Sequence, residues 1–134
     1  MPEYIFVYGT LRKDSPQPMA RLLVSHSQYI GEASIQGALY DLGRYPGVLE
    51  HQGYRTFGEL FRLEEPEKIL PPLDDYEECS AAYPEPTLYL RKLCPVLLED
   101  GSTVDAWVYV YNRQVTGCTL IEEGRYLEYL EGKS

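Results

Sequence analysis

The chain has 134 residues, of which 44% are hydrophobic and 25% charged, as is typical of one globular domain with a buried core. Its formal net charge of −9 argues against nucleic acid and anionic membranes as partners, because both require a basic surface. No apolar run approaches the ~18 residues that a membrane span needs, and the first residues lead into a strand without a signal-peptide pattern. We therefore expect a single domain over residues 1–134 and a cytoplasmic location.

The first predicted strand runs from Tyr4 to Tyr8 and stops at Gly9. Its β-branched and aromatic side chains are typical of a buried strand, and glycine allows a sharp turn after it. The N–H groups of such a turn, with the Thr10 hydroxyl, can hold a substrate carboxylate or a developing oxyanion. The alternative is a turn with only a structural role. The stretch lacks the glycine spacing of a phosphate-binding loop.

An amphipathic helix is predicted next, because Met19, Leu22, Leu23 and His26 follow the i, i+3, i+4, i+7 pattern. His26 is interpreted as a residue of the helix end. The other histidine, His51, lies in a glycine-containing turn. Neither has a serine or cysteine partner in a recognisable motif, so a catalytic triad is not expected.

Residues 29–40 form an extended segment in which Gly31 and Gly37 indicate bends, as in a curved sheet or small barrel. Residues 42–47 read as a turn or loop. Another strand is predicted over residues 55–63, with Glu59 on the same face as phenylalanines. Buried carboxylates are uncommon. Glu59 is therefore either a functional carboxylate or the partner of a cation such as Arg91.

The segment 64–78 is predicted to be helical, with Pro66 in the first turn and a break at Pro71-Pro72. A second short helix then starts at Pro72. Leu73, Tyr76 and Glu77 share one face of it, which should dock on the core. Docking would partly desolvate Glu77 and raise its pKa toward the range useful for proton transfer. Glu77 is the best acid/base candidate; alternatively it only caps or pairs with nearby groups.

Residues 79–87 are predicted to form a loop, and two long strands then cover 88–98 and 103–112. Asp100-Gly101 is a hairpin turn pair between them. The second strand is apolar on both faces, as expected for a central strand. A loop over 113–124 and a last short helix from Tyr126 follow. The order of elements predicts an α+β fold, a small mixed β-barrel with peripheral short helices.

Cys79, Cys94 and Cys118 are too widely spaced for a disulfide framework or a metal motif and are interpreted as reduced cysteines. No cluster has metal-ligand spacing. We therefore expect no metal and no cofactor. The 13 tyrosines, against three phenylalanines and one tryptophan, have two interpretations: half-buried strand positions, or a polar pocket lined by phenols.

Two motifs resemble those of the gamma-glutamylcyclotransferase-like family, of the small gamma-glutamylamine cyclotransferase type. They are Tyr8-Gly9-Thr10-Leu11 and Leu73-Asp74-x-x-Glu77. Supporting segments follow in the family's order: Gly58-Glu59-Leu60, Tyr89 with Arg91, residues 107–111, and residues 123–126. The chain departs from the pattern at Glu78, where many members have glycine, and at the Pro71-Pro72 pair before the second motif.

The resemblance implies that Tyr8, Gly9, Thr10 and Leu11 bind a small-molecule gamma-glutamyl substrate and that Glu77 is the general acid/base. The implied reaction converts a gamma-glutamyl amine or amino acid to 5-oxoproline plus free amine. Glu77 should then face the Gly9 turn across a pocket. Two alternatives stay open: a non-catalytic binding module for a gamma-glutamyl or similar carboxylate ligand, and a related enzyme acting on another kind of amide. The leaving amine, the oligomeric state and the roles of Glu59, Arg12 and Arg91 are left open.

Overall fold

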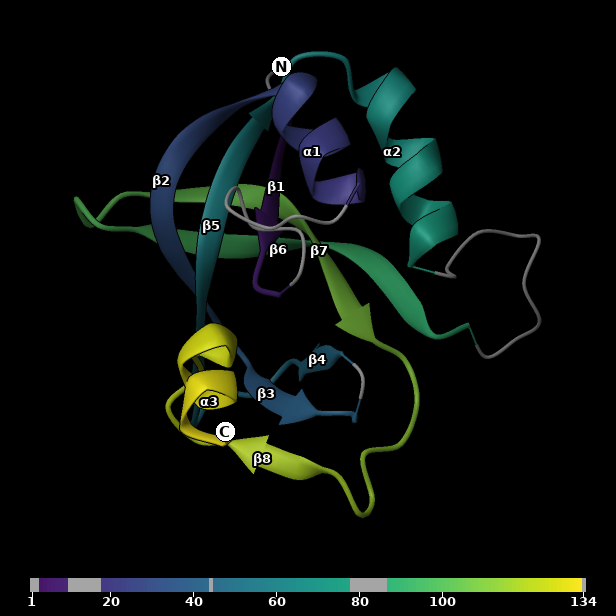
Figure 1. Ribbon diagram of the computed structural model, residues 1–134. Coiled ribbons are helices and arrows are strands. Elements are labelled where there is room, and N and C mark those ends of the chain that lie inside the picture. Colours follow the sequence, from purple (N-terminus) through teal and green to yellow (C-terminus); the bar gives the residue numbers. More distant parts are fainter. Residues whose placement is uncertain (1–2, 10–17, 44, 78–86, 134) are drawn as a thin grey trace.

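The computed structural model describes residues 3–9, 18–43, 45–77 and 87–133, and within them the chain forms strands and short helices (Figure 1). Their order is β1 (Glu3–Val7), α1 (Pro18–Ser25), β2 (Ser27–Gln36), β3 (Ala38–Asp41), β4 (Pro46–Leu49), β5 (Arg55–Leu63), α2 (Pro66–Tyr76), β6 (Tyr89–Leu98), β7 (Thr103–Tyr111), β8 (Thr119–Ile121) and α3 (Tyr126–Lys133). None of the described helices is long and apolar enough to cross a membrane.

Five of the strands close into a barrel in the order β1-β5-β2-β6-β7, with β7 pairing back to β1. The closing pair is parallel, with Ile5 opposite Trp107, whereas the other neighbouring pairs of the barrel are antiparallel. Each of these five strands therefore pairs with a neighbour on both sides, through one residue pair between β1 and β7 and two between β2 and β6. The prediction of an α+β fold with a small mixed barrel and peripheral short helices is confirmed.

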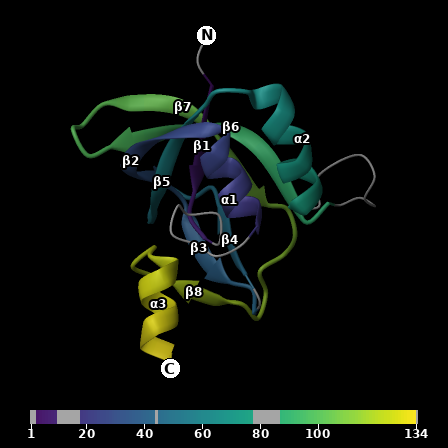
Figure 2. The ribbon, with the colours of Figure 1, turned by 45° about the horizontal axis from the view of Figure 1, so that its top comes forward.

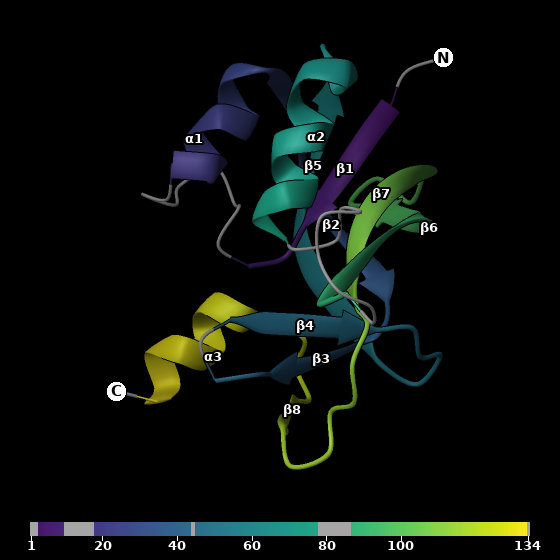
Figure 3. The ribbon, with the colours of Figure 1, turned by 90° about the vertical axis from the view of Figure 1, so that its right-hand side faces the viewer.

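The remaining strands, β4, β3 and β8, extend the sheet from β7. With α3 they lie at the opposite end of the molecule from α1 and α2 (Figures 1 and 3). The loops predicted over 42–47 and 113–124 are therefore partly wrong, because they contain residues of β4 and all of β8. Both strands are short, and each has a partner from a distant part of the chain: Val48 of β4 pairs with Val110 of β7, and Ile121 of β8 pairs with Leu39 of β3. The strand β4 also pairs with β3, which directly precedes it.

The predicted bends are confirmed in β2 and after it. The β2–β5 register shifts between Tyr29 and Gly31, and Gly37 separates β2 from β3. The 98–103 hairpin also forms as predicted: the Leu98 N–H donates to the Ser102 carbonyl at 2.8 Å. These local features could be predicted from the sequence because each depends on glycine or on a short turn.

The core lies on both sides of the barrel wall. One cluster includes residues from all five barrel strands, among them Phe6, Leu60 and Val108, and fills the interior. The other packs Ile5 and Val7 of β1 against α1 and α2. Because alternate residues of a strand point to opposite faces, β1 is buried on both sides. The strand that leads to Gly9 is thus fixed firmly.

The helix α2 runs unbroken from Pro66 to Tyr76, so the predicted break at Pro71-Pro72 is wrong. Ile69 and Leu73 are fully buried on either side of the proline pair, and this packing keeps the helix continuous. It lies beside α1 (Figures 2 and 3). Only part of the predicted docking face is buried, since the Tyr76 side chain is 43% exposed.

Candidate active site

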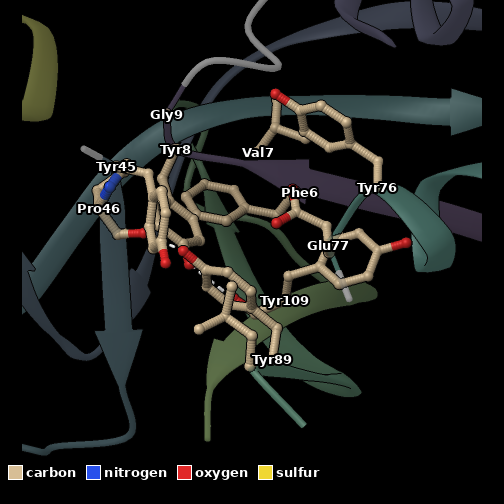
Figure 4. A pocket seen from close by; sticks show the side chains of 11 residues that line it. Phe6, Val7, Tyr8, Gly9, Tyr45, Pro46, Tyr76, Glu77, Tyr89 and Tyr109 are labelled. Atoms are coloured by element: carbon tan, nitrogen blue, oxygen red, sulfur yellow. Dashed lines mark hydrogen bonds between the residues drawn. The ribbon is translucent and has the colours of Figure 1, made fainter. Parts of the chain in front are cut away.

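A cavity of about 260 Å³ opens where β1, the end of α2, β4, β6 and β7 meet (Figure 4). It is lined by Phe6, Val7, Tyr8, Gly9, Tyr45, Pro46, Tyr76, Glu77, Leu88, Tyr89 and Tyr109. The structure therefore brings Tyr8 and Gly9 of the first motif together with Glu77 of the second. Thr10 and Leu11, the other two predicted binding residues, lie outside the described residues.

Tyr8 is held in place by its hydroxyl group, which donates a hydrogen bond to the Tyr109 carbonyl at 2.6 Å. The same hydroxyl accepts a hydrogen bond from the Val48 N–H at 3.3 Å. The side chain is buried, and both partners belong to strands next to the cavity. This fixed phenol forms one wall of the cavity.

Gly9 is required for a different reason from the one predicted. It is not among the glycines with a positive φ, so it does not need a backbone conformation closed to other residues. Instead, a Cβ at this position would lie 2.7 Å from Pro46 Cγ. Gly9 therefore allows the end of β1 to approach the start of β4 closely, and this approach forms part of the cavity.

Glu77 immediately follows α2, and its N–H donates to the Leu73 carbonyl at 2.9 Å. Leu73 is fully buried, so the residue that closes the helix is tied to the core through the backbone. Burial of the Glu77 carboxyl raises its pKa to about 7. A carboxyl with this pKa exchanges protons readily near neutral pH.

Tyrosines dominate the surroundings of Glu77, which supports the interpretation of a pocket lined by phenols. Burial raises the pKa of Tyr8 and of Tyr89, and the nearby Glu77 carboxylate raises both further. The Tyr89 hydroxyl donates to the Pro46 carbonyl at 2.5 Å. Tyr8 and Tyr89 therefore stay neutral. Among the described residues that line the cavity, Glu77 carries the only carboxyl group.

The cavity is braced by residues whose roles the sequence left undefined. The Asp74 carboxylate accepts hydrogen bonds from Arg91 Nε at 2.7 Å and Nη2 at 3.1 Å, and from the Tyr109 hydroxyl at 2.8 Å. Arg91 thus pairs with Asp74, one helical turn before Glu77. The position of Asp74 inside the second motif was the only sign in the sequence that it has a role. Its partners could not be predicted, because they lie on distant strands.

Other candidates lie elsewhere. Glu59 is 2% exposed in β5, as expected for a carboxylate among apolar neighbours, but it is not part of the described cavity lining. The lining also contains neither histidine; His26 Nδ1 lies 3.1 Å from Glu65 Oε1. Cys94 and Cys118 are free thiols, and Cys79 and Arg12 lie outside the described residues. The described side chains include no group of three His, Cys, Asp or Glu residues placed to hold a metal.

Comparisons with known proteins identify the family. The family model for gamma-glutamyl cyclotransferase, AIG2-like proteins matches residues 5–128. A gamma-glutamylcyclotransferase family protein, ytfP, from Citrobacter rodentium is 35% identical over 125 residues, covering 92% of this chain and 95% of that protein. A gamma-L-glutamyl-butirosin B gamma-glutamyl cyclotransferase from Niallia circulans is 37% identical over 111 residues, covering 81% of this chain and 67% of that protein.

Solved structures lead to the same family. The solution structure of ytfP from Escherichia coli superposes with a TM-score of 0.63 and 31% identity, covering 94% of this chain and 97% of that one. The family model, the curated relative and the solved structure each cover nearly the whole chain. The resemblance of the motifs is thus confirmed, and the chain belongs to the gamma-glutamyl cyclotransferase, AIG2-like family.

Proposed function

We propose that this protein converts a gamma-glutamyl amine or amino acid to 5-oxoproline and a free amine, with Glu77 as general acid/base. The observation that carries the proposal is the Glu77 carboxyl, whose pKa is raised to about 7 in a cavity that it shares with Tyr8 and Gly9. The family supports a gamma-glutamylcyclotransferase-like activity. The Niallia circulans relative, whose name specifies a gamma-L-glutamyl compound, supports that substrate class.

The reaction needs no protein nucleophile, because the substrate carries its own. The α-amine attacks the γ-carbonyl carbon, a new C–N bond closes the five-membered ring, and the old amide C–N bond breaks. Glu77 takes a proton from the α-ammonium group and returns one to the leaving amine. An ordinary glutamate, with a pKa of ~4.3, is too weak a base for the first step, so the raised pKa fits this role.

The enzyme must also bend the substrate so that amine and carbonyl meet, which is catalysis by proximity. We assign the binding of the gamma-glutamyl group to Tyr8, Gly9, Thr10 and Leu11, acting through backbone groups at the end of β1. The fixed Tyr8 side chain and the close packing of Gly9 on Pro46 support a rigid binding surface there. A rigid surface helps because no energy is then needed to order it during the reaction.

The test offers a panel of gamma-glutamyl amines and amino acids to the wild-type protein and measures 5-oxoproline. Glu77→Gln should lower kcat by about 10²-fold or more, because the amide cannot accept the proton. Glu67→Gln is a matched control, since this exposed glutamate lies in the first turn of the same helix. Full turnover by Glu77→Gln would remove Glu77 from the proposed role. Thermal stabilisation by these ligands without any 5-oxoproline would favour the non-catalytic binding module instead.

A further inference from the structure

Asp74 connects the helix that carries Glu77 to the barrel wall. Arg91 binds both carboxylate oxygens of Asp74, and the Tyr109 hydroxyl binds one of them as well. Such bidentate, charge-assisted contacts are short and directional. The Asp74 and Arg91 side chains are only 20% and 22% exposed, so water weakens the pair less than it would weaken one at the surface. Asp74, Arg91 and Tyr109 are called the Asp74 network below.

The barrel side of this network is itself firmly held. Arg91 and Tyr109 are directly opposite each other in the antiparallel β6–β7 register, so their side chains lie on the same face of the sheet. Arg91 also lies 4.2 Å above the Trp107 ring, and Trp107 Nε1 donates to Glu3 Oε1 at 3.1 Å. The two partners of Asp74, Arg91 and Tyr109, therefore form a fixed binding surface for its carboxylate on the barrel.

The last turn of α2 depends on contacts outside the helix. Pro71 and Pro72 have no N–H groups, so they give two fewer hydrogen bonds to the helix. In the last turn Leu73 is fully buried, whereas Tyr76 is partly exposed. The Asp74 network supplies the polar fixation of this turn, three residues before Glu77. The same Tyr109 accepts the Tyr8 hydrogen bond through its carbonyl, which links both walls of the cavity.

We propose that Asp74, Arg91 and Tyr109 are positioning residues, which fix the last turn of α2 on the barrel and so hold the Glu77 carboxyl inside the cavity opposite Tyr8. The inference rests on the proposed function, in which Glu77 transfers the protons. The three residues act through Glu77 and need no contact between their polar groups and the substrate.

A direct consequence concerns the protonation of Glu77. The titratable groups that face it across the described cavity are Tyr8 of β1, Tyr45 before β4, Tyr89 of β6 and Tyr109 of β7, with Tyr76 beside it and the Asp74–Arg91 pair one turn away. Burial is the cause of the raised pKa of Glu77. If the last turn of α2 loosens, water reaches the carboxyl and its pKa falls.

Two variants test the network without changing the net charge near Glu77. Tyr109→Phe removes one hydrogen bond to Asp74 and keeps the ring. Arg91→Lys keeps the positive charge but cannot bind both carboxylate oxygens. The Glu77 pKa is read by carbon-13 NMR of labelled glutamate carboxyls in the substrate-free protein, with the signal assigned by its loss in Glu77→Gln. Steady-state kinetics with the best substrate of the panel give kcat and KM.

In both variants we expect the Glu77 pKa to fall by about one unit toward the ordinary ~4.3. We also expect kcat to fall by about tenfold with little change in KM, because a displaced base affects the chemical step more than binding. The matched control is Tyr129→Phe, which removes a similar hydrogen bond, from the Tyr129 hydroxyl to Asp41 Oδ2 at 2.9 Å, away from the cavity. It should leave the Glu77 pKa, kcat and KM unchanged.

An unchanged Glu77 pKa and kcat in both variants would overturn the proposal, even if their melting temperatures fall, since a loss of stability alone indicates an ordinary structural contact. A rise in KM with kcat preserved would also overturn it, because the network would then contact the substrate. The NMR measurement separates the two hypotheses. If the wild type forms no 5-oxoproline but the Glu77 pKa falls in both variants, the proposed function fails and the positioning role stands.

Discussion

The carboxyl group of Glu77 combines two opposing demands. Its burial disfavours the charged form, which raises the pKa to about 7 and suits proton transfer at neutral pH. The same burial makes the ionised form costly to the folded state. In the unfolded chain the carboxyl ionises at ~4.3, so between these two values the folded protein binds more protons than the unfolded one. The contribution of Glu77 to the free energy of unfolding therefore falls as the pH rises through this range.

This gives a prediction for Glu77→Gln. The wild type should lose about 2 kcal/mol of stability, relative to the variant, as the pH rises from about 4 to 8, allowing for partial exposure of the carboxyl. The variant lacks the titrating group, so the difference between the two proteins measures Glu77 alone. Urea denaturation at a series of pH values is the measurement. A difference that does not change with pH would show that Glu77 titrates normally.

At the scale of the element, α2 shows how packing overrides local preference. Pro71 and Pro72 lie inside the helix, where proline removes a hydrogen bond and clashes with the preceding turn. Ile69, Leu70 and Leu73 are buried around them, and Asp74 is bound to the barrel. These contacts compensate for the prolines, and they are the reason that the predicted break does not occur.

Replacing one proline should therefore stabilise the protein. In Pro71→Ala the new N–H can bond to the Glu67 carbonyl, and the side chain at this position is exposed. We expect a gain of about 1 kcal/mol, since the restored helix geometry outweighs the greater freedom of the unfolded chain. Pro66→Ala is the control: proline is favourable at the first helical position, so no gain is expected there. Urea denaturation compares the variants, and equal effects at both positions would contradict this account.

For the whole molecule, barrel closure determines the site. The end of β1 lies next to β5, and the backbone there is packed closely: a Cβ at Gly58 would lie 2.1 Å from the Val7 carbonyl oxygen and 3.0 Å from Tyr8 Cα. These are backbone atoms of the strand that leads into the cavity. They cannot rotate away as a flexible side chain would.

Gly58→Ala is accordingly expected to lower stability by about 3 kcal/mol and to reduce activity through displacement of Tyr8 and Gly9. Gly132→Ala serves as the control, because nothing lies within 4 Å of a Cβ at that position of α3. Thermal and urea denaturation of both variants are compared with the wild type. A Gly58→Ala protein as stable as Gly132→Ala would mean that the β1–β5 contact adapts more easily than its geometry indicates.

The sequence by itself determined the features that depend on local chemistry. Strand-forming residues before Gly9, the helical spacing around Leu22, and the Asp100-Gly101 turn each predicted the element that forms. The two motifs predicted the family and the barrel, and they named Glu77 and Gly9, which the structure places around one cavity. The roles of Glu77 and of Tyr8 to Leu11, and the single domain over residues 1–134, stay predictions.

Only the tertiary structure decided the features that depend on residues far apart in the chain. The strands β4 and β8 are too short for a clear pattern: β8 forms because β3 offers it a partner, and β4 pairs with distant β7 as well as with β3, which precedes it. The continuity of α2, the Pro46 contact that requires glycine at position 9, and the Asp74 network follow from the same cause. Local residue types set backbone preferences, but barrel closure determines which distant side chains meet. At the cavity this packing buries the Glu77 carboxyl, and burial raises its pKa.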